Sequence, residues 1–346
     1  MSDLDTILKL EKHIRIKIPK TDKLDCCSFG YVANDNNNVI ALGLSNCRLK
    51  AIPKEICDLE YLLELDFNIN DIRRIEDLDK LTCLQHLNFS NNQIRKTENL
   101  DTLSSLQELD SFRKKINTIE NSDNLTGLKK LRFMNNQILT IENLDNNTNL
   151  EILVLFGNRI QTIENLDNLQ SLRVIILNNN LIGTIGNLSE LATLKRLDLA
   201  ENQIQKIENL EKLSDLRVLN LDKNQISEIE NLTVLTNLQN LILSNNEISK
   251  IRNLSTLTEL RYLNIAENQI SKLENMNTLG KLEELNLVDN QIAKLENLDM
   301  HSNLQKLNIA SNQIEKNENV DKLTNLQDFI YWCNPIDGVE DIDKFY

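Results

Sequence analysis

Hydrophobic positions recur along the chain with a constant step of 22 residues. The pattern Leu-x-x-Leu-x-Leu-x-x-Asn-x-Ile starts at Leu62 and returns at every 22nd residue up to Leu326, and one earlier copy starts at Val39. About fourteen repeats therefore run from residue 39 to residue 342. Within each repeat the Leu-x-Leu alternation has the period of a β-strand, so it predicts a short strand whose leucines point inward.

The second half of each repeat reads Ile-Glu-Asn-Leu-x-x-Leu, as in residues 207–213. Its leucines are three residues apart, which suits a short 3₁₀ or irregular segment better than a long helix. The asparagine after the strand, for example Asn92 or Asn136, stands where the chain turns, and its amide can bond backbone groups of adjacent repeats. Strands of successive repeats are then expected to stack about 4.8 Å apart as a parallel sheet.

A single repeat cannot fold alone. About seven buried apolar side chains at ~2 kcal/mol each fall short of the ~1 to 2 kcal/mol per residue needed to order the chain. Stacking is obligatory, and the ends of the stack need caps. The predicted fold class is an α/β solenoid, a right-handed horseshoe with a parallel sheet on its concave face and short 3₁₀ or irregular segments on its convex face.

The ends of the repeat array define the expected domains. Residues 1–38 are predicted to form an N-terminal helical cap, because Ser2 and Asp5 resemble a capping box and Leu4, Ile7 and Leu8 give one apolar helical face. Residues 39–342 are predicted to form the solenoid, and residues 343–346 a short C-terminal tail.

The side chains two, four and six positions after the first leucine of a repeat are expected on the concave face. In the first repeats they form an acidic edge, followed by an apolar field over four consecutive strands. The acidic edge comprises Glu64, Asp66, Glu108 and Asp110, and the apolar field comprises Phe112, Met134, Ile152, Val154, Phe156, Val174 and Ile176. Isolated exposed apolar residues need no explanation, but a contiguous patch usually marks a binding surface. We therefore predict a protein-binding site here.

Later repeats return to polar residues on this face, with Tyr262 among them and with Asp328, Ile330 and Trp332 in the last repeat. Trp332 is the only tryptophan of the chain. It is expected either to pack in the C-terminal cap or to serve as a binding anchor, a role for which tryptophan is enriched.

One repeat, residues 106–127, breaks the pattern. Ser111 stands where a core leucine belongs, Lys114 replaces the asparagine of the ladder, and Ser122 replaces the leucine of the second half. An unpaired buried lysine is costly, so Lys114 is expected to point outward. Two explanations account for this irregularity. Either one repeat of a long array has lost its consensus residues, or the repeat is distorted beside Phe112 for a functional reason.

Charge and targeting signals narrow the partners. The chain has 38 Lys and Arg against 52 Asp and Glu, a formal net charge of −14, which disfavours nucleic acid and acidic lipid. The sequence shows neither a signal peptide nor a membrane span, and its six cysteines lack Cys-x-x-Cys spacing. We expect a monomer in a reducing compartment, the cytoplasm or, in a eukaryote, the nucleus, without nucleic-acid or membrane partners.

Catalytic constellations are missing from the sequence. His13, His86 and His301 lie far apart in the repeat array, and no glycine-rich phosphate-binding motif occurs. Acidic pairs such as Glu108 with Asp110 sit on an open sheet, where nothing is expected to desolvate them and raise a pKa. Aligned glutamates of the outer ladder, such as Glu208, spread along a line instead of converging on a cation. We predict no enzyme, no cofactor and no metal site.

The string Ile-Glu-Asn-Leu-x-x-Leu-x-x-Leu of residues 207–216 resembles the 22-residue class of leucine-rich repeats typified by protein phosphatase 1 regulatory subunit 7, over about residues 62–339. That resemblance implies regulation of a type 1 Ser/Thr protein phosphatase through concave acids and aromatics. In that family the last repeat reads Leu-Gln-Glu-Phe-Trp. In this chain Asp328 keeps the acidic residue, Ile330 stands at the tryptophan position, and Trp332 follows two residues later. The internalin family has the same 22-residue repeat length, but its members are secreted and carry an immunoglobulin-like domain, for which the given sequence has no counterpart.

Two functional hypotheses follow from these features. The first is a non-enzymatic scaffold that binds another protein on its concave face. The alternative is a regulatory subunit of a type 1 Ser/Thr phosphatase that uses the concave acids and residues 328–332.

Overall fold

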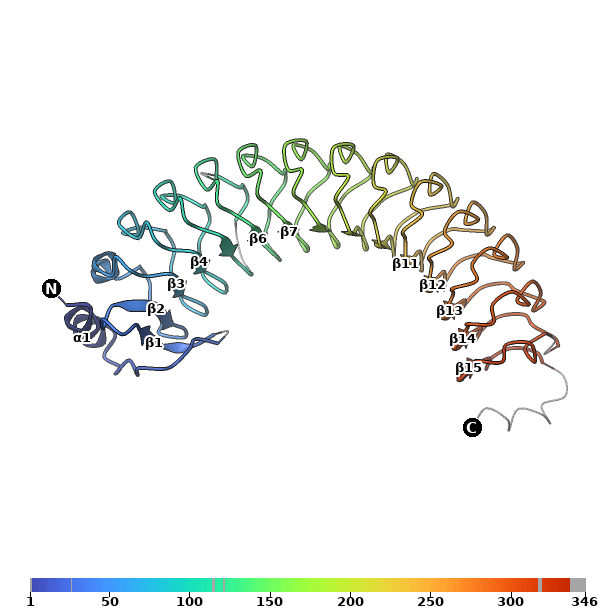
Figure 1. Ribbon diagram of the computed structural model, residues 1–346, viewed down its shortest axis with the longest axis horizontal. Coiled ribbons are helices and arrows are strands. Elements are labelled where there is room, and N and C mark those ends of the chain that lie inside the picture. Colours follow the sequence, from blue (N-terminus) through green and yellow to red (C-terminus); the bar gives the residue numbers. More distant parts are fainter. Residues whose placement is uncertain (1, 26, 114–115, 121, 317–318, 337–346) are drawn as a thin grey trace. The chain divides into compact units, whose positions relative to one another are not determined.

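The computed structural model describes residues 2–25, 27–113, 116–120, 122–316 and 319–336, and it forms two compact units (Figure 1). The N-terminal unit spans residues 1–174 and the C-terminal unit residues 175–346. Both are built from the same coil, a three-residue strand followed by a turn and an irregular segment that leads to the next strand. No helix of the described part is long and apolar enough to cross a membrane.

The N-terminal unit begins with helix α1 (Asp3–Ile14), which starts at the predicted capping box. The backbone N–H of Asp5 donates to Ser2 Oγ at 3.2 Å, and the backbone N–H of Ser2 donates to Asp5 Oδ2 at 3.1 Å. The apolar face was predicted in part: Ile7 is buried as expected, but Leu4 and Leu8 are exposed, and Leu10 is buried in their place.

A strand that the pattern does not predict completes the cap. Strand β1 (Phe29–Ala33) pairs antiparallel with β2 (Val39–Leu44), and Gly30 lies opposite Gly43. A Cβ at Gly43 would collide with the carbonyl oxygen of Ser28, so this close approach of the two backbones requires glycine. A single 3₁₀ helix, η1 (Lys54–Asp58), follows β2, and elsewhere in the described part the second halves of the repeats are irregular turns.

From β2 onward the strands pair in parallel and follow chain order within each unit. In the N-terminal unit they are β3 (Glu64–Asp66), β4 (His86–Asn88), β5 (Glu108–Asp110), β6 (Lys130–Arg132) and β7 (Ile152–Val154). Strand β8 (Val174–Ile176) spans the boundary. The C-terminal unit continues with β9 (Arg196–Asp198), β10 (Val218–Asn220), β11 (Asn240–Ile242), β12 (Tyr262–Asn264), β13 (Glu284–Asn286), β14 (Lys306–Asn308) and β15 (Asp328–Ile330). The predicted parallel-strand solenoid is confirmed, and the number of turns is close to the expected fourteen.

Two ladders of asparagine hold successive repeats together. Asn92 accepts the N–H of Ile72 at 3.0 Å and donates to the carbonyl of Phe67 at 2.8 Å, both in the preceding repeat. In the outer ladder Asn209 has a left-handed backbone, with φ of 59°, and donates to the carbonyl of Ile185 at 2.6 Å. Asparagine suits both positions because its amide bonds backbone groups that would otherwise be orphaned, and at the outer position it also tolerates the left-handed region.

Candidate functional site

The first and third residues of each short strand project from the sheet on the side opposite the core. The middle residue is buried with the core leucines, as Leu65, Leu87 and Leu109 are in β3, β4 and β5. We call the surface formed by the other side chains the open face of the sheet. Pairing in register places equivalent residues of neighbouring repeats side by side, so that Glu64 lies beside His86 and His86 beside Glu108.

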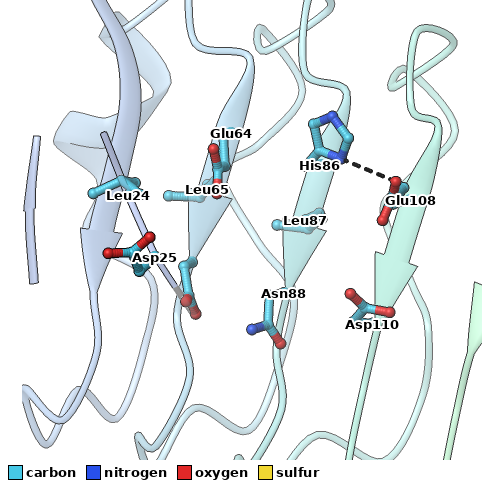
Figure 2. A pocket seen from close by; sticks show the side chains of 10 residues that line it. Leu24, Asp25, Glu64, Leu65, His86, Leu87, Asn88, Glu108 and Asp110 are labelled. Carbon is cyan, nitrogen blue, oxygen red and sulfur yellow. Dashed lines mark ion pairs between the residues drawn. The ribbon is translucent and has the colours of Figure 1, made fainter. Parts of the chain in front are cut away.

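The open face of β3 to β5 is hollowed, and carboxylates line the hollow. Its volume is about 340 Å³. Five acids face it, namely Asp25, Glu64, Asp66, Glu108 and Asp110, with His86 and Asn88 between them (Figure 2). The structure thus brings the four acids of the predicted edge into one site, which we call the acidic hollow. Asp25 was missed because it comes from the segment before β1, which has no register in the repeat.

The acids of β5 are ion-paired with the next strand. Arg132 Nη1 lies 3.2 Å from Glu108 Oε2 and 3.0 Å from Asp110 Oδ1, and Lys130 Nζ lies 2.7 Å from Glu108 Oε1. Burial acts to raise the pKa of Glu108, but hydrogen bonds from Lys130 and Arg132 outweigh it and lower that pKa from its ordinary value. At Asp110 burial prevails over Arg132, and the pKa is raised. His86 Nδ1 also lies 3.8 Å from Glu108 Oε1 (Figure 2).

The acids of β3 have no such cation. Neither Glu64 nor Asp66 forms an ion pair with any residue that the structure describes. Asp66 is only 6% exposed and accepts the N–H of Asn68 at 2.7 Å. Burial raises the pKa of both carboxyls. The expectation that an open sheet leaves its acids fully solvated is therefore wrong, because neighbouring strands and the cap segment remove water from them.

The apolar field is smaller than the sequence suggests. Val154 is the third residue of β7 and lies on the open face as predicted, but it is only 7% exposed and adds little accessible apolar surface. The partly exposed members in the N-terminal unit are Phe112, Met134, Ile152, Phe156 and Val174, whereas Ile176 belongs to the C-terminal unit and is also partly exposed. The guanidinium of Arg113 lies 5.1 Å from the centre of the Phe112 ring and stacks on it.

The irregular repeat keeps its buried positions but fills them with polar residues. Ser111 is 7% exposed and Ser122 is fully buried. In the following repeat Asn147, also fully buried, takes a leucine position and donates to the carbonyls of Ser122 at 3.1 Å and Leu125 at 2.8 Å. The irregularity therefore extends into two adjacent repeats, beside Phe112. Lys114 lies outside the described residues.

The candidate residues of the C-terminal unit form a separate group. Tyr262 and Asp328 line one small hollow of about 180 Å³ together with Glu284 and Lys306, whose carboxylate and ammonium lie 3.0 Å apart. Trp332 does not line this hollow and is 67% exposed. The C-terminal cap on which it could pack lies outside the described residues, so both expected roles stay predictions.

Metal and thiol chemistry find no support in the described residues. No group of three or more His, Cys, Asp or Glu in that part of the chain could hold a metal ion. Among the described cysteines, burial raises the pKa of Cys47 to about 11.

Family models connect these repeats to known sequences. A model of paired leucine-rich repeats matches residues 148–190, 192–234 and 236–278, and a model of one leucine-rich repeat matches residues 83–109. The fold is a leucine-rich repeat solenoid. No curated protein sequence matches the chain.

Solved leucine-rich repeat structures have the same fold. An internalin, InlF, from Listeria monocytogenes is 26% identical with a TM-score of 0.67, over 89% of this chain and 84% of that one. The leucine-rich repeat protein LIC12759 from Leptospira interrogans is 25% identical with a TM-score of 0.71, over 85% and 90%. A plant peptide hormone receptor, RGFR1, solved in complex with RGF2, is 23% identical with a TM-score of 0.62, over 83% of this chain and 54% of that receptor. These matches do not identify the phosphatase-regulator class.

Proposed function

We propose that this leucine-rich repeat solenoid is a non-enzymatic scaffold that binds another protein on the open face of its N-terminal unit. One observation carries the proposal. Along β3 to β7 the open face changes from carboxylates, through ion-paired cations, to partly exposed apolar side chains, and this order does not follow the repeat. The repeated residues maintain the fold, so residues that depart from the repeat are available for recognition.

Two further features support a protein ligand. Partly exposed apolar side chains flanked by charges are typical of interface cores with polar rims. A structural neighbour, RGFR1, was solved in complex with RGF2, which shows that this fold can present a surface to a peptide hormone.

The alternative is regulation of a type 1 Ser/Thr phosphatase through the C-terminal unit. Two exposed side chains support it. Asp328 lines one hollow with Tyr262, and an exposed tryptophan such as Trp332 suits a binding anchor. The two proposals use different units, so single substitutions distinguish them.

A pull-down from native extract with wild type, Phe156→Asp and Asp328→Ala tests both. Under the first proposal Phe156→Asp reduces recovery of the main partner at least about tenfold, because it places a charge in the apolar contact, while Asp328→Ala has no effect. Recovery of a phosphatase that Asp328→Ala abolishes would support the alternative. Ile242→Asp is the matched control, since Ile242 is a partly exposed isolated residue on β11. If neither Phe156→Asp nor Asp328→Ala changes any partner, both proposals are wrong.

A further inference from the structure

Strands β3 and β5 have the same sequence, Glu-Leu-Asp, and the same position in the repeat. On β5 the carboxylates meet the side chains of β6, with Glu108 in register with Lys130 and Asp110 in register with Arg132. On β3 the equivalent neighbours are His86 and Asn88 on one side, and Ala41 and Gly43 on the other. The two strands thus present the same acidic pair to different neighbours.

The ion pairs of β5 show which group such a pair accepts. A single nitrogen of Arg132 contacts both Glu108 and Asp110, at 3.2 and 3.0 Å. Lys130 contacts Glu108 alone. A guanidinium carries five donors in a planar fork that matches carboxylate geometry, whereas an ammonium acts as a point charge. On β5 the Glu-x-Asp pair thus holds a guanidinium that the neighbouring strand supplies.

The pair on β3, Glu64 and Asp66, has the same acids as the guanidinium site on β5 and has space beside it for a guanidinium. Glu64 and Asp66 line the acidic hollow of about 340 Å³, where no described lysine or arginine pairs with them. Ala41 and Gly43 on β2 carry no long side chain that could fill it. Leu24 lines the same hollow, and an apolar wall of this kind can pack against the methylene stem of an arginine.

We propose that Glu64 and Asp66 bind the guanidinium of an arginine side chain of the partner protein, as Glu108 and Asp110 bind that of Arg132. This inference rests on the proposed function and specifies the partner's chemistry at one site. The bound arginine lies at the acidic end of the open face, with the partner chain continuing across β4 to β6 toward the partly exposed Ile152 and Phe156. Partner binding then supplies a cation to the partly buried Glu64 and the buried Asp66, which have none within the described residues.

A titration of the full chain with N-acetyl-argininamide tests the site without knowledge of the partner. Binding is followed by NMR of the backbone amides of Leu65 and Leu87, which border the hollow although their side chains are buried in the core, and of the ¹³C-labelled methyl groups of Leu24. N-acetyl-citrullinamide has the same shape without the charge, and N-acetyl-lysinamide has the charge without the fork. We expect saturable shifts of Leu65 and Leu87 with the arginine derivative, at least about tenfold weaker binding of the lysine derivative, and none of the citrulline derivative.

Two variants place the binding at β3. The double variant Glu64→Gln with Asp66→Asn should weaken argininamide binding at least about tenfold, since it keeps the shape and removes both charges. Asn88→Arg should abolish argininamide binding, because the new arginine on the neighbouring strand occupies Glu64 and Asp66. Glu284→Gln, at the same position of β13, is the matched control and should leave binding unchanged. Absence of saturable shifts, binding that survives both β3 changes, or equal binding of lysinamide would each overturn the proposal.

Failure of this inference can be told from failure of the proposed function. Suppose that Phe156→Asp releases the partner, while argininamide does not bind and the Glu64→Gln, Asp66→Asn variant retains the partner. The scaffold proposal then stands and the arginine site is wrong. If argininamide binds β3 but Phe156→Asp leaves partner recovery unchanged, the assignment of the apolar contact is wrong instead.

Discussion

Strands β3 and β5 offer a comparison within one molecule, because both carry Glu-Leu-Asp at the same position of the repeat and on the same face. The pair on β5 is neutralised by Arg132 and Lys130 of the next strand, whereas the pair on β3 faces His86 and Asn88. The difference shows that in a solenoid the chemistry of a side chain depends on the residues one repeat before and one repeat after it. Equal local sequences therefore perform different tasks.

The first prediction removes the cation from the acidic pair of β5, Glu108 and Asp110, and has the largest expected effect. Arg132→Met keeps the apolar stem but leaves Asp110 without its cation and Glu108 with Lys130 and His86. Leaving partly buried carboxylates unpaired should lower the free energy of unfolding by about 2 kcal/mol. The measurement is the shift of the urea unfolding midpoint at pH 7.

Lys306→Met is the control for this change. Lys306 pairs with Glu284 at 3.0 Å, but its side chain is 53% exposed, and exposed pairs contribute little to stability. If Arg132→Met lowers the free energy of unfolding no more than Lys306→Met does, the β5 pair is an ordinary surface ion pair.

The second prediction contrasts the two glutamates at neutral pH. Glu64→Gln should stabilise the protein and Glu108→Gln should destabilise it, each by up to about 1 kcal/mol. The raised pKa of Glu64 means that its ionisation favours unfolding as pH rises from the ordinary value of 4.5 through the raised value. The lowered pKa of Glu108 means that its charge stabilises the fold above 4.5, and this stabilisation is lost as pH falls through the lowered value.

Urea unfolding at pH 7 and at about pH 3 measures these signs. At the lower pH the advantage of Glu64→Gln should vanish, because the carboxyl is then protonated in both the folded and the unfolded states. The cost of Glu108→Gln should shrink as well, because Glu108 becomes protonated. Effects of the same sign at pH 7 would contradict the contrast between the two strands.

The sequence predicts most of this architecture because the repeat fixes register. A step of 22 residues places Glu64, Asp66, Glu108 and Asp110 on one face before any coordinates are known. It also predicts the asparagine ladder, since each amide must reach the backbone of an adjacent turn. Where every neighbour is set by the repeat, pattern reasoning is sufficient.

Features outside the repeat could not be predicted in this way. Asp25 reaches the acidic hollow from the cap, whose strand β1 has no counterpart in the repeat. The burial of Val154 and of Asp66 depends on side chains that surround them in space, and these vary from repeat to repeat. Desolvation of the acids, and with it their pKa values, follows from the same packing.

The last prediction supplies a cation to the acidic pair of β3 by a substitution on β4, and it has the smallest expected effect. Asn88→Arg places a guanidinium on β4 in register with Asp66, as Arg132 stands in register with Asp110. The new pair should offset the lost hydrogen bond from the N–H of Ser90 to Asn88 Oδ1, at 2.9 Å. We expect a net gain of about 0.5 kcal/mol in the free energy of unfolding.

Asn308→Arg is a matched control for that substitution. It removes the equivalent bond from the N–H of Ala310, at 3.2 Å, but its neighbour in register is Asn286, which offers no charge. The one acid of that strand, Glu284, is already paired with Lys306 at 3.0 Å. The control should therefore lose stability where Asn88→Arg gains it, and urea unfolding of both variants at pH 7 measures the difference. Equal losses in the two variants would mean that β3, despite its sequence, does not form the guanidinium site that β5 forms with Arg132.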